Sequence, residues 1–502
     1  MTDGRRPGPS GSASTAGPGG PALPLSASWV AAAMAGGIVS GDASREFGGV
    51  SIDSRTLAAG ELYVAIRGER FDGAEFAKAA IAAGAAGVVV PKGRGASLPP
   101  SREASADRRS LGGGGSNERV VVIEVDDTTR ALQSLARAVR RASGAKVVAI
   151  TGSAGKTTTK EITAEFLAAR YRVIRNRGNF NNHIGLPLSL MELRQRPEMA
   201  VVELGMNHAG EISALIGVAE PDVRVWTNVG DAHLGFFASV DAIADAKAEV
   251  LQGAGASTLL VANADDDRVM ARVASFPGRT VTFGIEREAA VRASAVVDRG
   301  IDGIGARVTT SRGSVDITTP LVGRSNLANV LAAAAVATEF DVPLDAIAAR
   351  AATLQAARHR GEVVRLASGV TVIDDSYNAS PAATMCAIDV LARARAGRRI
   401  AVLGEMLELG GHATARHQDV GRAAAKAGVD VLFAVGGHAA HALADAALAA
   451  GMARAAVRHF ATSDEAADAV AALVTRGDLV LVKGSRGVKT DRVVERLTAG
   501  RG

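Results

Sequence analysis

Apolar runs alternate with stretches of helix length over most of the chain. In the middle of the chain the runs are KVVAI, MAVVEL, VRVWTNV and STLLVAN, and further on they are VTVIDD, RRIAVLG, VDVLFAV and DLVLVKG. Strands that are buried on both faces read as continuous apolar runs, and the helices between them are the crossovers of a parallel sheet. The pattern therefore predicts an α/β protein with doubly wound sheets.

Spacing and composition divide the chain into an N-terminal tail and three domains. A length of 502 residues is too great for one core at roughly 150 residues per domain. Residues 1–25 are rich in Gly, Pro and Ser and are predicted to be disordered, as is a Gly-rich, charged insertion at 92–119. We expect a small N-terminal α/β domain at 26–143, a central domain with a mostly parallel sheet at 144–355, and a C-terminal Rossmann-like domain at 356–502.

The distribution of charge and the single cysteine argue against a nucleic-acid-binding protein and against a disulfide-bonded one. Residues 92–120 carry a net charge of +3 and residues 1–25 carry +1, out of +5 for the chain. The excess lies in segments predicted to be flexible, and aromatic residues make up 3% of the chain, which argues against nucleic-acid binding. The only cysteine, Cys386, excludes an intrachain disulfide and is expected to be a core residue. No secretory signal or membrane span is found, so we expect a cytoplasmic protein without membrane insertion.

The stretch AITGSAGKTTTKE is the strongest candidate for chemistry. An apolar run leads into a glycine turn, and a helical pattern follows, which is the context of a phosphate-binding loop. In that interpretation Lys156 reaches the β- and γ-phosphates and Thr157 binds Mg²⁺. The spacing is G-x-x-G-K-T from Gly152 and Gly155, because Ile150 stands where the longer pattern has its first glycine. The alternative is a glycine turn that enters a helix with a surface lysine.

Two further polar residues follow predicted strands of the same domain. Glu203 ends the run MAVVEL, and His233 follows VRVWTNV by a short loop. Ligand sites of open α/β sheets lie beyond the carboxyl ends of the strands. Thr157, Glu203 and His233 therefore predict a Mg²⁺ site with more than one ion, although each residue alone could be a cap or a satisfied polar group.

Asparagines gather in two segments of the central domain. Asn179, Asn181 and Asn182 lie in NRGNFNNHIGLPLSL, where they either form Asx turns or bind a polar, peptide-like substrate. Asn326 and Asn329 are spaced i, i+3 in GRSNLANVLAA and share one helical face. For this second pair the alternative is capping of the helix N-terminus.

The order of these motifs resembles that of the Mur ligases, ATP-dependent amide-bond ligases of the bacterial cytoplasm that build the peptide stem of peptidoglycan. The resemblance rests on GSAGKTTTKE, ELGMNHAGEI, NVGDAHL, SNLANVLAA, DDSYNASP and VKGSRGVK. It covers roughly residues 27–498 outside the insertion, and it accounts for the short phosphate loop, since these ligases are similar in using that spelling. Within the family the chain is most similar to the member that adds D-alanyl-D-alanine to UDP-N-acetylmuramoyl-tripeptide.

The resemblance implies the reaction and its partners. ATP would phosphorylate the terminal carboxylate of the tripeptide, and the amine of D-Ala-D-Ala would attack the acyl phosphate with the help of two Mg²⁺ ions. The N-terminal domain would bind the UDP-sugar, and we expect a monomer with no nucleic-acid partner. The main alternative is a sister ligase that adds a diamino acid to the UDP-MurNAc-dipeptide, but its Asp-Asn-Pro-Arg-like motif is absent and DDSYNASP stands instead. A folylpolyglutamate-synthase-like enzyme and a nucleotide-dependent switch are more distant alternatives.

The resemblance also assigns residues to roles. The implied catalytic residues are Lys156, Lys247, His233 and Arg360. The implied ATP-binding residues are Gly152, Ser153, Ala154, Gly155, Lys156, Thr157, Thr158, Asn326, Asn329, Arg360 and Asp374. The implied metal ligands are Thr157, Glu203, His233 and Lys247, the last as a carbamate. The implied substrate-binding residues are Ser54, Arg55, Asn179, Asn181, Asn182, Asn207, Asn378, Ser380, Lys483 and Arg486.

Two of these assignments have open alternatives. Lys247 could equally be an ordinary surface lysine of a helix. His359 precedes Arg360 where the family commonly has a glycine, which weakens the assignment of Arg360.

Overall fold

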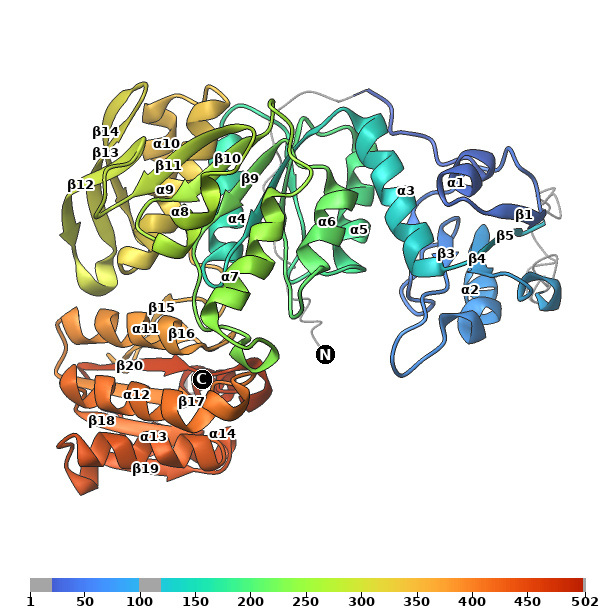
Figure 1. Cartoon of the computed structure of the whole chain (residues 1–502). Helices are drawn as coiled ribbons and strands as arrows, with labels where there is room; N and C mark the ends of the chain where they lie inside the picture. Colours follow the sequence, from blue (N-terminus) through green and yellow to red (C-terminus); the bar gives the residue numbers. More distant parts are fainter. Residues whose placement is uncertain (1–19, 99–118, 500–502) are drawn as a thin grey trace, which may run out of the picture.

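The computed structural model of the chain describes residues 20–98 and 119–499, and these residues form three α/β units, each around its own sheet (Figure 1). The predicted disorder of residues 1–19 and 99–118 lies outside the described residues. At 92–98 the prediction of a disordered insertion is wrong, because Gly95–Ser97 form a short 3-10 helix, η2, and Gly95 N donates to Glu124 Oε1 at 2.7 Å. Near the end of the predicted tail the prediction is wrong, because Leu23 and Leu25 are buried and the Leu23 amide donates to Arg194 O at 2.8 Å. Apolar side chains thus anchor the start of the described chain to the central unit.

The N-terminal unit has a five-stranded sheet in the order β1-β5-β4-β3-β2, in which only β1 is antiparallel to its neighbour. Its strands are β1 (Gly37–Ser40), β2 (Val50–Ser51), β3 (Leu62–Val64), β4 (Gly87–Pro91) and β5 (Val121–Val125). Its helices are α1 (Ala27–Ala33) and α2 (Ala77–Ala83). Gly84 ends α2 in a left-handed conformation, which glycine adopts without strain.

The central unit has a nine-stranded sheet in the order β14-β13-β12-β11-β10-β9-β6-β8-β7, parallel from β7 to β12. Its strands are β6 (Lys146–Thr151), β7 (Val173–Arg175), β8 (Met199–Glu203), β9 (Val223–Trp226), β10 (Leu259–Asn263), β11 (Arg279–Gly284), β12 (Val291–Asp298), β13 (Ile304–Thr310) and β14 (Gly313–Thr319). Its helices are α4 (Lys156–Leu167), α5 (Gly185–Leu190), α6 (Glu211–Ala219), α7 (Val240–Ala248), α8 (Asp267–Val273), α9 (Arg324–Glu339) and α10 (Leu344–Ala351). The mostly parallel sheet is as predicted.

The C-terminal unit has a six-stranded sheet in the order β15-β16-β20-β17-β18-β19, parallel except for β15. Its strands are β15 (Glu362–Arg365), β16 (Thr371–Asp375), β17 (Arg398–Gly404), β18 (Val431–Val435), β19 (Val457–Phe460) and β20 (Asp478–Lys483). Its helices are α11 (Pro381–Arg393), α12 (Ala413–Lys426), α13 (His438–Ala449), α14 (Ser463–Leu473) and α15 (Asp491–Ala499). Helices between parallel strands confirm the doubly wound prediction.

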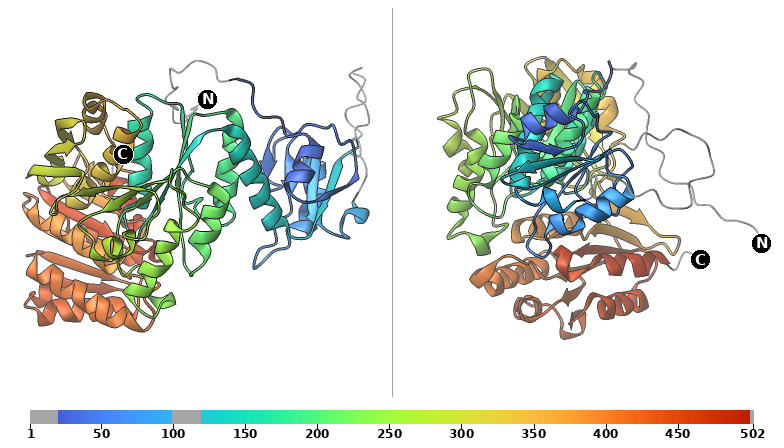
Figure 2. Two further views of the ribbon diagram at one scale, coloured as in Figure 1. Left: turned by 45° about the horizontal axis from the view of Figure 1, so that its top comes forward. Right: turned by 90° about the vertical axis from the view of Figure 1, so that its right-hand side faces the viewer.

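Helix α3 (Thr128–Ser143) joins the N-terminal unit to the central one. It packs against α1 on one side and against α5 and α6 on the other. Arg140 fixes its end, donating to Ala145 O at 2.8 Å and pairing with Asp222 at 2.7 Å. The N-terminal unit therefore extends to one side of the central unit, whereas the C-terminal unit lies beneath it (Figures 1 and 2). No helix in the described ranges is both long and apolar enough to cross a membrane.

Candidate active site between the central and C-terminal units

The phosphate-loop motif folds as the predicted strand, turn and helix. Ile150 is fully buried in β6 beside Glu203 of β8, and α4 begins at Lys156. Gly155 has φ +80°, and a Cβ there would lie 2.4 Å from Asn329 Oδ1. Only glycine fits this position, because other residues would combine backbone strain with a clash. The position of Ile150 is thus simply the buried end of the strand that carries the loop.

The loop is held in shape by residues that follow the neighbouring strand β9. Ala154 N donates to Asn228 Oδ1 at 2.8 Å, and Asn228 Nδ2 returns a bond to Ala154 O at 3.1 Å. Gly230 N donates to Ser153 Oγ at 2.8 Å. Sequence reasoning missed Asn228, although its place directly after VRVWT was a usable signal. The carboxyl ends of β6 and β9 therefore form one rigid edge.

Lys156 bends back over the loop. Its Nζ donates to Gly152 O at 2.9 Å and the residue is half-buried, so it is not the free surface lysine of the alternative interpretation. Burial lowers the pKa of Lys156, the Glu203 carboxylate opposes this effect, and Arg360 adds to it. A cation with few solvent contacts is suited to meet an anionic group at this loop.

Glu203 stands at the centre of a polar cluster. Thr157 Oγ1 donates to Glu203 Oε2 at 2.7 Å, and Asn181 Nδ2 donates to Glu203 Oε1 at 2.8 Å. Glu203 is only 3% exposed, so both oxygens are satisfied within the protein. The structure thus brings together a hydroxyl from α4, a carboxylate from β8 and an amide from the asparagine loop.

The other asparagines of that loop have separate roles. Asn182 Oδ1 accepts from Gly185 N at 2.8 Å and so forms the local turn of the alternative interpretation. Asn179 is exposed. Asn176 Oδ1 accepts from Glu203 N at 3.0 Å, which ties the start of the loop to β8. Of the predicted asparagine set, only Asn181 reaches the Thr157–Glu203 cluster through its side chain.

Lys247 is 1% exposed in α7, so its interpretation as a surface lysine is wrong. In the described parts of the chain its Nζ has no hydrogen-bond acceptor or carboxylate partner. Burial, together with the charge of Lys156, holds the pKa of Lys247 well below its ordinary value. A buried amine without an acceptor favours the neutral form, which is the nucleophilic one.

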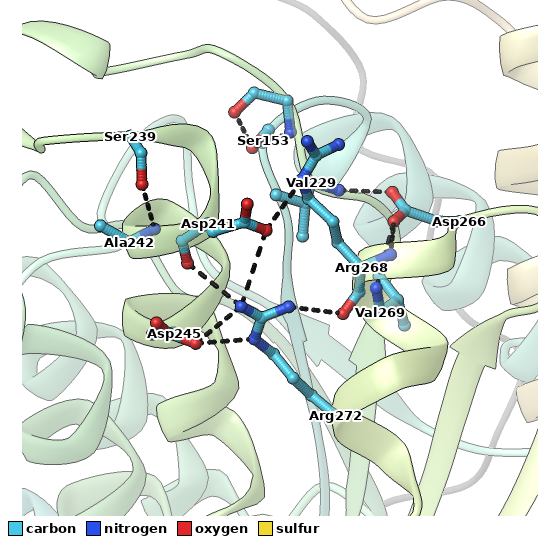
Figure 3. A network of polar contacts seen from close by, with 11 residues as sticks. Ser153, Val229, Ser239, Asp241, Ala242, Asp245, Asp266, Arg268, Val269 and Arg272 are labelled. Atoms are coloured by element: carbon cyan, nitrogen blue, oxygen red, sulfur yellow. Dashed lines mark hydrogen bonds and ion pairs between the residues drawn. The ribbon is translucent and has the colours of Figure 1, made fainter.

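Helix α7 is held in place by α8, as Figure 3 shows. Arg272 pairs with Asp245 at 2.7 Å, and Arg268 donates to Asp241 Oδ1 at 3.1 Å. Asp266 caps α8 and also accepts from Val229 N at 2.7 Å (Figure 3). Helix α8 therefore positions both the helix of Lys247 and the segment that leads to His233.

The paired asparagines of α9 lie against the phosphate loop. Thr159 Oγ1 donates to Asn329 Oδ1 at 3.1 Å, and Asn329 Nδ2 donates to Asn326 Oδ1 at 3.2 Å. Neither caps α9, because Gly323 is the N-cap residue and no side chain bonds there. The capping alternative is therefore wrong.

The C-terminal unit gathers a second polar cluster at the ends of β16 and β20. Lys483 Nζ pairs with Asp375 Oδ2 at 2.6 Å and donates to Asn378 O at 3.1 Å, and Lys483 is buried. Ser485 Oγ donates to Ala379 O at 3.4 Å and accepts from Leu407 N at 2.9 Å. The motifs DDSYNASP and VKGSRGVK thus form one structure, in which Asp375 is a partner that sequence reasoning missed.

The side chain of His359 contacts the carboxylate of Asp374. Its Nδ1 lies 2.7 Å from Asp374 Oδ2, and Ser376 Oγ donates to Asp374 Oδ1 at 2.6 Å. His359 has φ +63°, the backbone conformation that glycine adopts most readily. Arg360 lies 4.1 Å and Arg486 5.7 Å from the centre of the Tyr377 ring. Both arginines are therefore placed by one aromatic residue, through cation–π contacts.

The loop after β9 touches the C-terminal unit. His233 Nδ1 lies 2.6 Å from Glu408 Oε2, Gly235 N donates to Glu408 O at 2.7 Å, and Ala382 N donates to Asp231 Oδ1 at 3.4 Å. These contacts bring the start of α11, with Ser380 as its N-cap residue, beside the phosphate loop. His233 thus faces Glu408 rather than the Thr157–Glu203 cluster, and within the described residues no three His, Cys, Asp or Glu side chains are grouped as a metal site.

Three of the predicted site residues and the predicted core cysteine lie elsewhere. Ser54 and Arg55 follow β2 in the N-terminal unit, where Arg55 pairs with Asp53 at 2.6 Å. Asn207 is exposed before α6, and its backbone amide donates to Glu211. Cys386 is exposed on α11, so its prediction as a core residue is wrong. A helix that packs on one face leaves positions such as Cys386 on the other.

The fold and this site define a three-unit α/β protein with a short phosphate loop that faces a polar C-terminal cluster. Three family models match the chain: the Mur ligase family catalytic domain at residues 46–140, the Mur ligase middle domain at 150–337, and the Mur ligase glutamate ligase domain at 359–486. The chain belongs to the Mur ligase family.

Relatives and solved structures that are similar to this chain belong to the same family. The chain is 33% and 35% identical to UDP-N-acetylmuramoyl-tripeptide--D-alanyl-D-alanine ligases of Bacillus subtilis and Escherichia coli, in each case over 89% of this chain and 93% of the relative. A crystal structure of MurF from Acinetobacter baumannii matches with TM-score 0.82 and 29% identity over 95% of this chain and 100% of that one. MurF ligase from Thermotoga maritima in complex with ADP matches with TM-score 0.75 and 27% identity over 90% of this chain and 97% of that one.

Proposed function

We propose that this protein is an ATP-dependent ligase that joins D-alanyl-D-alanine to the terminal carboxylate of UDP-N-acetylmuramoyl-tripeptide. The observation that carries the proposal is the joint between units. Ala382 N of the C-terminal unit donates to Asp231 Oδ1 at 3.4 Å, and a Cβ at Gly230 would lie 3.7 Å from Ser153 Cβ of the phosphate loop and 3.9 Å from Ala382 Cβ. The relatives whose names describe this reaction align over 93% of their length, so all three units are accounted for.

ATP binds at the phosphate loop, and the MurF ligase of T. maritima was solved in complex with the product nucleotide, ADP. Gly152 to Thr158 wrap the phosphates, with Lys156 as the cation at the β- and γ-positions. Asn329, which lies against Gly155 and accepts from Thr159, belongs to the nucleotide site together with its bonded partner Asn326. Asp374 contributes to that site from the C-terminal unit. Arg360 reaches the γ-phosphate from the C-terminal unit.

The residues present fit Mg²⁺. The hydroxyl of Thr157 and the carboxylate of Glu203 meet at 2.7 Å and are hard oxygen donors, the type that Mg²⁺ prefers. A second ion would be held by His233 and a carbamate on Lys247. Bound Mg²⁺ would supply positive charge that offsets the charge of the phosphates.

Carbamylation of Lys247 needs the neutral amine that its surroundings favour. The Nζ lone pair attacks the carbon of CO₂, an N–C bond forms, one C–O π pair moves to oxygen, and a proton is released. The product is a carboxylate that replaces an unpartnered amine, in a place where the positive charge of Lys156 disfavours a second cation. Burial thus favours the neutral amine of Lys247, and reaction of that amine with CO₂ gives an anionic ligand.

The chain's residues then position two successive displacements. The tripeptide carboxylate attacks the γ-phosphorus, ADP departs, and Lys156 with Arg360 stabilises the charge on the transferred group. The free amine of the dipeptide attacks the acyl phosphate, loses a proton, and expels inorganic phosphate. Asn378, Ser380, Lys483 and Arg486 hold the dipeptide.

The UDP-sugar substrate spans from the N-terminal unit to the joint. Ser54 and Arg55 hold its UDP-sugar end, and Asn179, Asn181, Asn182 and Asn207 line its peptide. The protein works in the cytoplasm as a monomer on small-molecule partners, without nucleic acid or membrane insertion.

A ligase that adds a diamino acid is the second candidate, and the similarities do not favour it. Its structural match, a UDP-N-acetylmuramoyl-L-alanyl-D-glutamate--2,6-diaminopimelate ligase, is 19% identical and shows the fold alone. DDSYNASP occupies the segment in which that ligase type is expected to differ.

Phosphate release from ATP tests the proposal. Release should require both UDP-MurNAc-tripeptide and D-Ala-D-Ala, and a diamino acid with the UDP-MurNAc-dipeptide should not replace them. Lys156→Met should abolish release, whereas Lys146→Met, which alters an exposed lysine at the other end of β6, should not. Release that persists without D-Ala-D-Ala would contradict the proposal.

A further inference from the structure

A side-chain contact between His233 of the central unit and Glu408 of the C-terminal unit joins the two units. Glu408 belongs to the loop after β17, and His233 to the loop after β9. Their side chains meet at 2.6 Å although the residues are 175 positions apart. His233 is 18% exposed and Glu408 is 43% exposed, so the contact is at the rim of the joint.

Backbone packing supports the contact on both sides. Gly235 N donates to Glu408 O at 2.7 Å, and a Cβ at Gly235 would lie 2.7 Å from Gly410 N. His233 and Glu408 have φ values of +66° and +65°, a conformation that few non-glycine residues adopt. Two strained residues that meet across a joint are held there by their surroundings rather than by local preference.

The Glu408 loop is also connected to the dipeptide end of the site. Leu407, the residue before Glu408, donates its amide to Ser485 Oγ at 2.9 Å, and Ser485 Oγ donates to Ala379 O. The loop therefore moves with the two motifs that frame Lys483. Its position reports whether the C-terminal unit is docked.

The bond also fixes which nitrogen of His233 is available. A carboxylate at Nδ1 holds the proton on that nitrogen and leaves the lone pair on Nε2. Histidines that bind metals generally donate their other ring N–H to a carboxylate or carbonyl, and loss of that partner costs about 10–100-fold in metal affinity.

We propose that Glu408 is a positioning residue that orients His233 for its metal, so that docking of the C-terminal unit completes the metal-binding end of the ATP site. This inference rests on the proposed function. It adds to that function a coupling: the unit that carries the dipeptide also supplies the partner of a metal ligand in the unit that carries ATP. Metal affinity in the presence of nucleotide then depends on a residue that touches neither.

The test measures Mn²⁺ binding to the full-length protein with ADP, by electron paramagnetic resonance, without tripeptide or dipeptide. Glu408→Ala should weaken Mn²⁺ binding about 10–100-fold, and Glu408→Gln, which keeps an acceptor oxygen, should recover most of the affinity. Asp445→Asn is the matched control, because Asp445 pairs with His441 at 3.0 Å within α13 and away from the joint. It should bind Mn²⁺ as the wild type does.

A second measurement needs no metal. Amide hydrogen exchange at residues 233–236 should accelerate in Glu408→Ala and remain at the wild-type rate in Asp445→Asn, because the Gly235 amide is protected only while the loops are docked. Wild-type Mn²⁺ affinity in Glu408→Ala would overturn the proposal, as would an affinity loss that Glu408→Gln does not recover. Absence of ligase activity in the wild type would instead overturn the proposed function, since neither binding measurement depends on turnover.

Discussion

Two buried lysines of the central unit, one on α4 and one on α7, have opposite surroundings. Lys160 is fully buried, and its Nζ donates to Asn176 O at 2.7 Å and pairs with Glu161 at 3.0 Å. Lys247 is 1% exposed and has no such partner in the described chain. Buried charges are tolerated when paired and bonded, and otherwise the group gives up its charge. Burial alone thus does not assign a role, whereas the partners of the ammonium group do.

The difference separates a structural lysine from a reactive one. Asn176 accepts from Lys160, and its own side chain bonds Glu203 N, so Lys160 fixes the base of the asparagine loop. Lys247 contributes no bond to the protein as it stands. Burial of an ammonium group without a hydrogen bond or ion pair costs stability. Such a group indicates a role in the reaction rather than in folding.

The largest effect is expected from removal of the reactive lysine. Lys247→Ala should lower kcat by about 100-fold or more, because the proposed anionic ligand is lost where charge develops in the transition state. Thermal unfolding of Lys247→Met, which keeps the buried volume that Lys247→Ala leaves empty, should show a protein at least as stable as the wild type. Steady-state phosphate release and calorimetry measure the two quantities. A fully active Lys247→Ala protein would remove the distinction between the two lysines.

Much of the central site could be predicted from sequence because it depends on local order. The run KVVAI, the glycine turn and the helical pattern are contiguous, and Thr157 and Glu203 follow from the rule for strand ends. Asn228 directly follows a predicted strand and falls under the same rule, whereas Glu408 could not be found in this way, since it contacts His233 across 175 residues. The segment DAIADAKAEV equally gives no sign that Lys247 lies on the buried face, because that depends on how Arg268 and Arg272 clamp α7.

In the C-terminal unit, too, the strands can be predicted from the sequence but the side-chain pairs between them cannot. Its strands were evident as apolar runs, but the pairing of Asp375 with Lys483 requires the register of β16 against β20. His359 looked like a departure from the family pattern, yet it supplies a partner for Asp374. The core prediction for Cys386 is wrong because the sequence alone does not say which face of α11 is packed.

The next effect concerns the structural lysine. Lys160→Met keeps the volume and removes the bonds to Asn176 O and Glu161, so the free energy of unfolding should fall by about 1–3 kcal/mol, the cost of a buried polar group left unsatisfied. Urea denaturation measures it. Lys247→Met is the matched control, since it makes the same change at an equally buried lysine without an acceptor, and it should not be destabilised. Equal losses in both variants would show that burial, and not partnership, sets the effect.

The smallest effect is the dependence of stability on pH. Burial holds the pKa of Lys247 well below 10.5 in the folded protein, whereas the unfolded chain has the ordinary value. Between the two values the unfolded chain binds more protons, so the free energy of unfolding rises with pH there, by up to about 1.4 kcal/mol per pH unit for one proton. Lys247→Met removes this contribution. Its stability should therefore rise less steeply with pH than that of the wild type at pH values below the ordinary 10.5, measured by urea denaturation in CO₂-free buffer. Parallel curves for the two proteins would show that Lys247 keeps its proton on folding, and the lysine could not then react as the neutral amine that carbamylation needs.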